Sequence, residues 1–150
     1  MFRDYATTLK QIKGVTEGEE NLIANLSNIA AILKELPGYF WVGFYLVNGE
    51  ELIVGPYQGP VACSRIKKGK GVCGYVWDSK SGIVVKDVHE FPGHIACSPI
   101  SKSEVVVPVF NTHGEVMMVL DVDSAEIADF DEKDKAALEK VANHITELMA

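Results

Sequence analysis

Three cysteines in the middle of the chain offer the most reactive chemistry in this sequence. Cys63, Cys73 and Cys97 all lie in turn-rich segments, whereas ordinary core cysteines are usually dispersed along apolar strands and helices. A thiolate can attack a substrate, a nearby thiol can then close a disulfide, and a reductant can reopen it. We therefore interpret the three cysteines as one redox site that the rest of the protein brings together.

Two other interpretations of the cysteines stay open from the residues alone. Zinc binding would use all three with His94, but the short Cys-x-x-Cys pairs of common structural sites are missing, so no metal site is expected. The thiols would otherwise be inert core residues.

Redox chemistry needs a lowered thiol pKa, and a nearby positive charge supplies it. His94 is one candidate for that charge, and the other histidines (His89, His113 and His144) are expected to face solvent. The other candidates are the basic residues that follow the first cysteine: Arg65, Lys67, Lys68 and Lys70.

Three acidic residues lie at the ends of two expected strands. Asp121 and Asp123 share one face of their strand because side chains alternate, and Glu104 begins the neighbouring strand. Clustered acids raise one another's pKa, so one of them would stay protonated near neutral pH and act as a proton donor. The acids also suit a substrate ammonium group. A solvated strand edge is the usual alternative.

Two aromatic residues are expected on one face of an early strand. Trp41, Gly43 and Tyr45 share that face, so two large rings would flank a glycine. Such a gap fits a small apolar group, for instance a methyl. Ordinary core packing is the more frequent explanation for an aromatic pair in a strand.

The composition is that of an ordinary globular domain, with 47% apolar and 23% charged residues. For 150 residues we expect one domain, 1–150. The net charge of −7 opposes binding to nucleic acid or to an anionic membrane. No targeting segment is visible, and the longest apolar run, Tyr39 to Val47, is too short to span a bilayer. Three cysteines without framework spacing indicate a cytoplasmic protein.

Periodicity and turn residues divide the chain into helices at both ends and strands between them. Thr16 and Glu19 form a capping-box pattern that would open the second helix, with Leu22 and Ile23 among its inward-facing residues. Asn48-Gly49 predicts a hairpin. The expected helices cover 2–13, 16–36, 72–79 and 131–148. The expected strands cover 39–47, 51–57, 83–86, 104–110 and 115–123, with irregular chain at 59–71 and 87–103.

This order of elements predicts an α+β fold. Consecutive strands joined by hairpins imply a central antiparallel sheet. The N- and C-terminal helices are expected to cover one face together, with the irregular active-site region on the other face.

Seven motifs lie in order between about residues 39 and 132. They are Trp41-Val42-Gly43-Phe44-Tyr45, Gly55-Pro56-Tyr57-Gln58-Gly59-Pro60-Val61-Ala62-Cys63, Gly69-Lys70-Gly71-Val72-Cys73-Gly74, Phe91-Pro92-Gly93-His94-Ile95-Ala96-Cys97, Ser103-Glu104-Val105-Val106-Val107-Pro108, Leu120-Asp121-Val122-Asp123-Ser124 and Phe130-Asp131-Glu132. Each motif alone is modest, but together they are specific. On these residues the chain resembles the free methionine-(R)-sulfoxide reductases, small enzymes built as a single GAF domain.

The resemblance implies reduction of free methionine-(R)-sulfoxide to methionine without a bound cofactor, with electrons from thioredoxin and NADPH. It implies that Cys97 is the nucleophile, whose thiolate attacks the sulfoxide sulfur and is left as a sulfenic acid. Cys63 or Cys73 would then condense with that sulfenic acid to a disulfide. We favour Cys63 as this resolving thiol and keep Cys73 as a second or relay thiol.

The resemblance also implies roles for the acidic and aromatic residues. Glu104, Asp121 and Asp123 would hold the substrate, and Glu104 or Asp123 would protonate the sulfoxide oxygen. Trp41 and Tyr45 would hold the methyl group. Because GAF domains commonly dimerise through their terminal helices, a homodimer is expected.

The competing function is a non-catalytic GAF module that senses a small ligand, and a structural zinc protein is the third class. A sensor is usually fused to an output domain, and no second domain is expected here. Ser98 departs from the family pattern, which usually has an Asp at this place, and so removes an acid beside the nucleophile.

Overall fold

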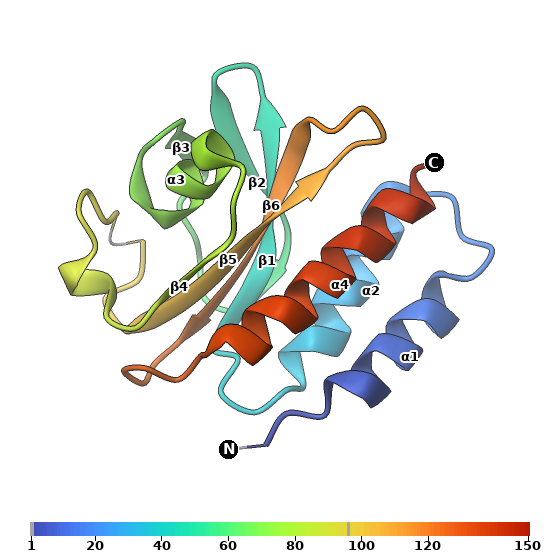
Figure 1. Cartoon of the computed structure of the whole chain (residues 1–150), viewed down its shortest axis with the longest axis horizontal. Coiled ribbons are helices and arrows are strands. Elements are labelled where there is room, and N and C mark those ends of the chain that lie inside the picture. The colour runs from blue at the N-terminus through green and yellow to red at the C-terminus, as the bar shows by residue number, and fades with distance from the viewer. Residues whose placement is uncertain (1, 96) are drawn as a thin grey trace.

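A six-stranded antiparallel sheet with helices on both faces makes up the computed structural model, which describes residues 2–95 and 97–150 (Figure 1). The strand order is β3-β2-β1-β6-β5-β4. The strands are β1 (Trp41–Asn48), β2 (Glu51–Gln58), β3 (Arg65–Lys67), β4 (Ile83–Val85), β5 (Ser103–Phe110) and β6 (Val116–Ser124). The helices are α1 (Tyr5–Thr16), α2 (Leu22–Lys34), α3 (Gly71–Ser79) and α4 (Glu132–Leu148), with a 3-10 turn at Val88–Glu90.

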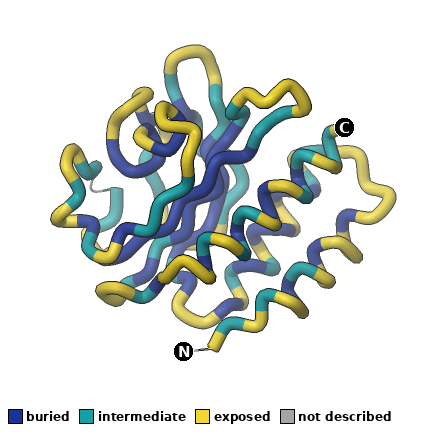
Figure 2. Tube along the Cα trace, viewed as in Figure 1, coloured by how far each residue is buried: buried dark blue, intermediate teal, exposed yellow. Residues whose placement is uncertain are grey.

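The terminal helices lie together on one face of the sheet, which confirms the predicted layering (Figure 1). Helices α2 and α4 pack on the strands, and α1 packs outside them. Dark blue segments in Figure 2 follow the strands and the inner sides of α2 and α4. Fully buried residues of this layer include Leu26, Ile29, Phe44, Leu120 and Leu138. This apolar layer leaves the opposite face of the sheet free to carry polar groups.

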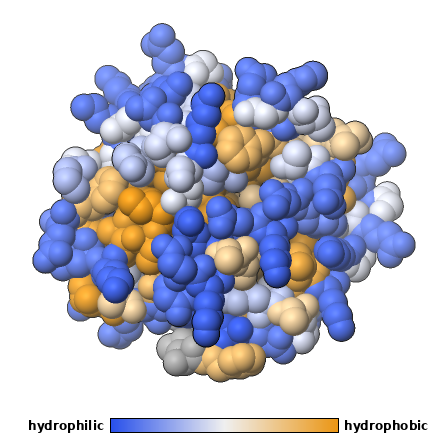
Figure 3. All heavy atoms as spheres, viewed as in Figure 1, coloured by the Kyte–Doolittle hydropathy of each residue, from blue (hydrophilic) through white to orange (hydrophobic). Residues whose placement is uncertain are grey.

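The opposite face carries a second, smaller buried cluster beneath α3 and the irregular chain. Trp41 and Tyr45 of β1, Cys73 of α3 and Val106 of β5 all belong to it. Figure 3 shows hydrophilic and hydrophobic side chains together on the surface, with the hydrophobic ones gathered left of the centre of the view, on the side of β4. The expected irregular region therefore lies over the second face, as the order of elements predicts.

The start of α2 differs from the prediction. Thr16 closes α1 and its hydroxyl donates to the Ile12 carbonyl, 2.7 Å away, so it does not begin a capping box. Asn21 is the N-cap of α2, and its side chain accepts from the Ala24 amide at 2.9 Å. Asn caps a helix as well as Thr does. Ile23, which was expected to face inward, lies in the first turn of α2 and is 53% exposed.

Two local predictions on the strands need adjustment. The first hairpin is present, but its turn is formed by Gly49 and Glu50, because Asn48 pairs with Glu51. Residues 59–71, expected as loop, include the short strand β3, whose Ile66 pairs with Leu52. An edge strand of three residues is too short to show an alternation in the sequence.

His144 does not face solvent as predicted. Its side chain is 13% exposed, and its Nε2 atom lies 3.0 Å from the Thr16 hydroxyl, where α4 passes the end of α1. His89 and His113 are exposed, as predicted. Among the described residues, no helix is long and apolar enough to cross a membrane.

Arg3 ties the beginning of the chain to the start of α4. Its side chain is 5% exposed and lies 2.9 Å from Asp129 and 3.2 Å from Asp134. Asp134 also accepts from the Tyr5 hydroxyl at 2.5 Å and completes the capping box that Asp131 begins. The ion pairs are nearly buried, so solvent screens them weakly.

We expect Arg3→Ala to lower the free energy of unfolding by about 3 kcal/mol, because it leaves two nearly buried carboxylates without their cation. Arg65→Ala is the matched control, since Arg65 is 63% exposed and its ion pair with Glu51 contributes less than about 1 kcal/mol. Urea denaturation measures both. Equal losses for the two variants would contradict this assignment.

Candidate active site

Strand pairing brings the predicted acidic and aromatic residues to one face of the sheet. Glu104 of β5 lies opposite Asp123 of β6, and Asp123 in turn lies opposite Trp41 of β1. Asp121 lies two residues along the same face, opposite Gly43. Directly opposed side chains on one face are close neighbours, so the register alone forces the carboxyl groups together.

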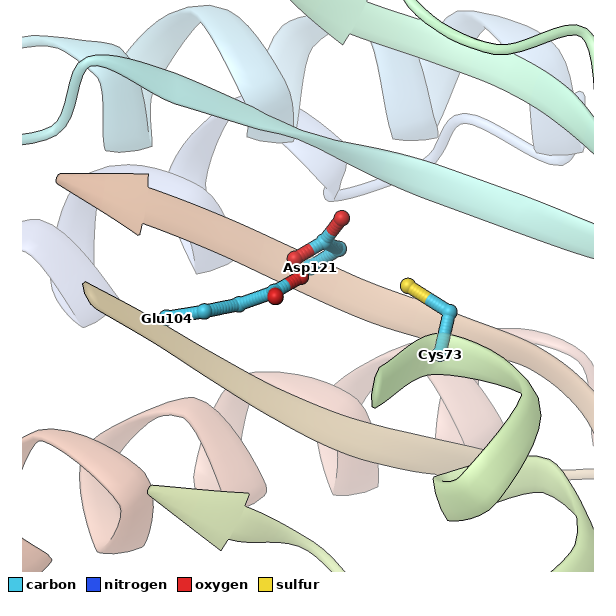
Figure 4. A group of neighbouring side chains, drawn as sticks. All are labelled: Cys73, Glu104 and Asp121. Carbon is cyan, nitrogen blue, oxygen red and sulfur yellow. The ribbon is translucent and has the colours of Figure 1, made fainter. Parts of the chain in front are cut away.

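Cys73 completes this cluster from α3. The Cys73 sulfur and one carboxyl oxygen each of Glu104 and Asp121 all lie within 4.8 Å of one another. Figure 4 shows the Glu104 side chain reaching to the Asp121 carboxyl group, with the Cys73 sulfur pointing from the helix towards them. All three residues are buried, and the Oδ1 atom of Asp121 has no hydrogen-bond partner among the described residues. That atom is an acceptor available to a donor entering from outside.

The environment favours the neutral forms of this cluster. Burial raises the pKa of Glu104 well above its usual range, and the charges of Asp121 and Asp123 add to the shift. Burial also raises the pKa of Asp121, while hydrogen bonds to Glu104 and Cys73 oppose the rise. The pKa of Asp123 is raised well above its usual range by burial and then by the charge of Asp121. Protons are therefore retained in the cluster at higher pH than on exposed carboxyls.

Cys73 is a buried thiol outside any disulfide. Burial raises its pKa well above the usual range, and the neighbouring charges of Asp121 and Glu104 raise it further. A thiol with a raised pKa holds little thiolate at neutral pH. In this state of the protein Cys73 is therefore a poor nucleophile.

The carboxyl groups form one wall of a cavity of about 50 Å³. The Trp41 and Tyr45 rings form another wall, with centroids 5.9 Å apart and planes 24° apart. The predicted gap over Gly43 is closed, because a β-carbon there would lie 2.8 Å from Cη2 of Trp41 and would also meet Tyr57. Further lining residues come from the irregular segments and α3: Ala62, Val72, His94, Ile95, Cys97, Ser98 and Ser101.

Cys63 and Cys97 form a disulfide beside this cavity. Their Cα atoms are 5.3 Å apart across 34 residues of sequence, and both residues are partly exposed. Two of the four proposed zinc ligands are thus consumed, since disulfide sulfurs are not thiolates. The zinc interpretation is wrong for this structure.

Neither source of positive charge predicted for the thiol is supported by the structure. Burial, and then the charge of His89, lowers the pKa of His94, so His94 is neutral near pH 7. Lys68 lies 5.1 Å from the Trp77 ring, and Arg65 pairs with Glu51. None of the described residues that line the cavity is Lys or Arg.

Comparison with known proteins shows which family has this fold. The GAF domain family matches residues 20–150. A GAF domain-containing protein A from Dictyostelium discoideum is 52% identical, with 91% of this chain and 87% of the relative covered. The free methionine-R-sulfoxide reductase of Saccharomyces cerevisiae is 41% identical, with 91% and 81% covered. The structure of the free methionine-R-sulfoxide reductase from Neisseria meningitidis in complex with its substrate is 48% identical, has a TM-score of 0.93, and aligns over 97% of this chain and 87% of its own.

The chain belongs to the free methionine-R-sulfoxide reductases. Within this GAF-domain family, the chain is an oxidoreductase. The resemblance drawn from the seven sequence motifs is therefore confirmed, and so is the α+β GAF fold.

Sequence reasoning missed two residues at or beside the cavity. Tyr57 stacks on Trp41 with ring centroids 5.1 Å apart and pairs with Gly43. Counting residues from the turn would not have found this pair, because the register of the hairpin shifts between Tyr45 and Gly43. Ser101 is buried in the cavity wall, and nothing in the sequence around it indicates this position.

The raised pKa of Glu104 predicts how stability depends on pH. The unfolded chain ionises Glu104 at its ordinary pKa and the folded chain only at a higher pKa, so the wild type loses unfolding free energy as the pH rises between these values. Glu104→Gln cannot ionise. We expect the unfolding free energy of the variant, relative to that of the wild type, to increase by at least about 1 kcal/mol between about pH 5 and about pH 8.

Urea denaturation at the two pH values measures this gain. Glu51→Gln, which removes a carboxyl from the surface pair with Arg65, is the control. A difference between Glu104→Gln and the wild type that is the same at both pH values would contradict the assignment.

Proposed function

We propose that the chain reduces free methionine-R-sulfoxide to methionine through a Cys97 sulfenic acid and a Cys63–Cys97 disulfide. The observation that carries this proposal is the disulfide itself, placed at a cavity with an acidic wall. The relatives from yeast and Neisseria are named for the same activity. A non-catalytic sensor has no use for a disulfide at the mouth of its ligand cavity.

The proposed reaction has three steps: reduction of the sulfoxide, formation of the disulfide and reduction of the disulfide. The Cys97 thiolate attacks the sulfoxide sulfur, and the oxygen passes to Cys97 as methionine leaves, which gives a sulfenic acid. The Cys63 thiol then displaces that hydroxyl as water and closes the disulfide. A dithiol reductant reopens the disulfide and is itself oxidised. Over the cycle one sulfoxide and one dithiol yield methionine, a disulfide and water.

The acidic residues divide into a proton donor and an ammonium site. Glu104, whose pKa is raised well above its usual range, holds a proton that can reach the sulfoxide oxygen. The unpartnered Oδ1 atom of Asp121 and the partly exposed Asp123 are suited to accept from the substrate ammonium. A free amino acid carries that ammonium, whereas a methionine within a peptide does not.

The rings of Trp41 and Tyr45 supply the apolar contact for the methyl group. Both residues are nearly fully buried and line the cavity. Burial keeps water from competing for this contact. The substrate would thus be held at its two ends, the ammonium by acids and the methyl by rings.

The electron donor in this proposal is thioredoxin, recycled with NADPH, and the protein works in the cytoplasm without a bound cofactor. A reducing compartment supplies the dithiol that the cycle consumes. A homodimer through the terminal helices is also proposed, as GAF domains commonly form. The surface of α1 and α2 has a groove for such a contact, lined by Gln11, Val15, Asn28, Ala31, Ile32 and Glu35. Sedimentation of the purified chain tests the dimer.

We expect NADPH consumption with thioredoxin and thioredoxin reductase when free methionine-R-sulfoxide is supplied. The S epimer and a peptide-bound R-sulfoxide should give none, because the site binds the ammonium and one sulfoxide geometry. A continuous absorbance assay measures all three. No turnover with any of them, from protein whose three thiols are free, would contradict the proposal.

Two variants separate the roles of the paired cysteines. Cys97→Ser should lose methionine formation altogether, since no thiolate remains to attack. Cys63→Ser should still form one methionine per chain in a single mixing, and then stop at the sulfenic acid. Quantified methionine per chain measures both. Equal loss in the two variants would show that Cys63 acts before methionine leaves.

A further inference from the structure

We propose that Tyr45 and Trp41 are positioning residues for Cys63: their hydrogen bonds hold the Cys63 loop on β1 so that the Cys97 sulfenic acid meets its resolving thiol. The inference rests on the proposed function for its place in the cycle. It assigns these two residues a role separate from any contact with the substrate.

The loop that carries Cys63 runs from Gly59 to Ser64, between β2 and β3. The Tyr45 hydroxyl donates to the Cys63 carbonyl oxygen at 2.9 Å. The Trp41 indole nitrogen donates to the Pro60 carbonyl oxygen at 3.1 Å. Both donors come from the same strand, and burial raises the pKa of Tyr45 so that its hydroxyl stays protonated.

The loop ends are fixed on the same scaffold. Gly59 has a φ of +140°, and a β-carbon there would lie 2.7 Å from Cδ1 and 3.1 Å from Cα of Trp41. Glycine therefore lets the loop lie directly on that residue. At the other end, the Val54 amide of β2 donates to the Ser64 carbonyl at 3.0 Å. The Cys63 backbone is thus held between two anchored ends and by a side-chain donor of its own.

The segment around Cys97 is held differently. The Cys97 amide donates to the Ile95 carbonyl at 3.1 Å, and the Ile100 amide lies 3.4 Å from the Ser98 hydroxyl. The same segment is tied to α3 through the Gly71 amide, which donates to the Gly93 carbonyl at 3.2 Å, four residues before Cys97. Cys63 has in addition a side-chain donor on its own carbonyl, and its position sets the effective concentration that the sulfenic acid encounters.

Tyr45→Phe isolates the proposed role, because it keeps the ring and removes only the donor. The reduced protein is mixed with one equivalent of free methionine-R-sulfoxide, without reductant, in the presence of dimedone, which traps sulfenic acids. In a parallel arm hydrogen peroxide replaces the sulfoxide, since it oxidises a thiolate to sulfenic acid directly. Mass spectrometry gives the ratio of Cys97 adduct to Cys63–Cys97 disulfide.

We expect this ratio to rise about 5- to 10-fold in Tyr45→Phe, as fits one lost hydrogen bond. Trp41→Phe should raise the ratio as well, and it replaces the first variant if that variant does not fold. Cys63→Ser cannot form the disulfide and therefore gives the upper limit of the ratio. Tyr75→Phe removes a hydroxyl from an exposed position on α3 and should keep the wild-type ratio.

A wild-type ratio in folded Tyr45→Phe and Trp41→Phe, in both arms, would overturn the inference. The arms also separate two kinds of failure. If wild-type protein forms no methionine but peroxide still gives the ratio shift, the positioning role stands and the proposed function falls. Loss of stability alone would lower both products without changing their ratio.

Discussion

Burial of Glu104 and Asp121 beside the partly exposed Asp123, all on one face of the sheet, is the constraint on which this structure depends. Removing charged groups from water costs several kcal/mol each unless a partner or a proton neutralises them. No described Lys or Arg lines the cavity, so the cluster of Glu104, Asp121 and Asp123 retains protons instead. A cationic substrate group would relieve the same cost, which links the stability of the fold to the chemistry of its site.

The two faces of the sheet carry different kinds of residues. Helices α2 and α4 bury a continuous apolar layer on one face, with Arg3 fastening the start of the chain to α4. That layer supplies the free energy that lets the other face carry acids, a buried thiol and loops. Strands β1, β6 and β5 contribute to both buried layers, so the acidic residues on these strands are held by the same backbone as the core.

The sequence was sufficient wherever local periodicity decides the outcome. Alternation in β6 put Asp121 and Asp123 on one face, and the register with β5 then brought Glu104 beside them as expected. Tertiary contacts were not predictable in this way. His94 was one candidate for a positive charge near the thiols, and burial lowers its pKa so that it is neutral near pH 7. Thr16 was expected to open a helix that Asn21 caps instead.

The loop that carries Cys63 illustrates the same limit. The resemblance favoured Cys63 as the partner of Cys97, but nothing in the sequence shows that Tyr45, 18 residues earlier, bonds its carbonyl. The ring pair was predicted to leave a gap over Gly43, and Trp41 lies across that glycine because Tyr57 supports it from β2. Such contacts depend on side-chain directions that only the assembled sheet defines.

The most direct test of the account is a disulfide map after a single turnover. Fully reduced protein is mixed with one equivalent of free methionine-R-sulfoxide, alkylated and digested, and methionine is quantified in the same sample. We expect one methionine per chain, a peptide linked through Cys63 and Cys97, and an alkylated Cys73. A linkage through Cys73, or methionine formed while Cys97 remains a free thiol, would contradict it.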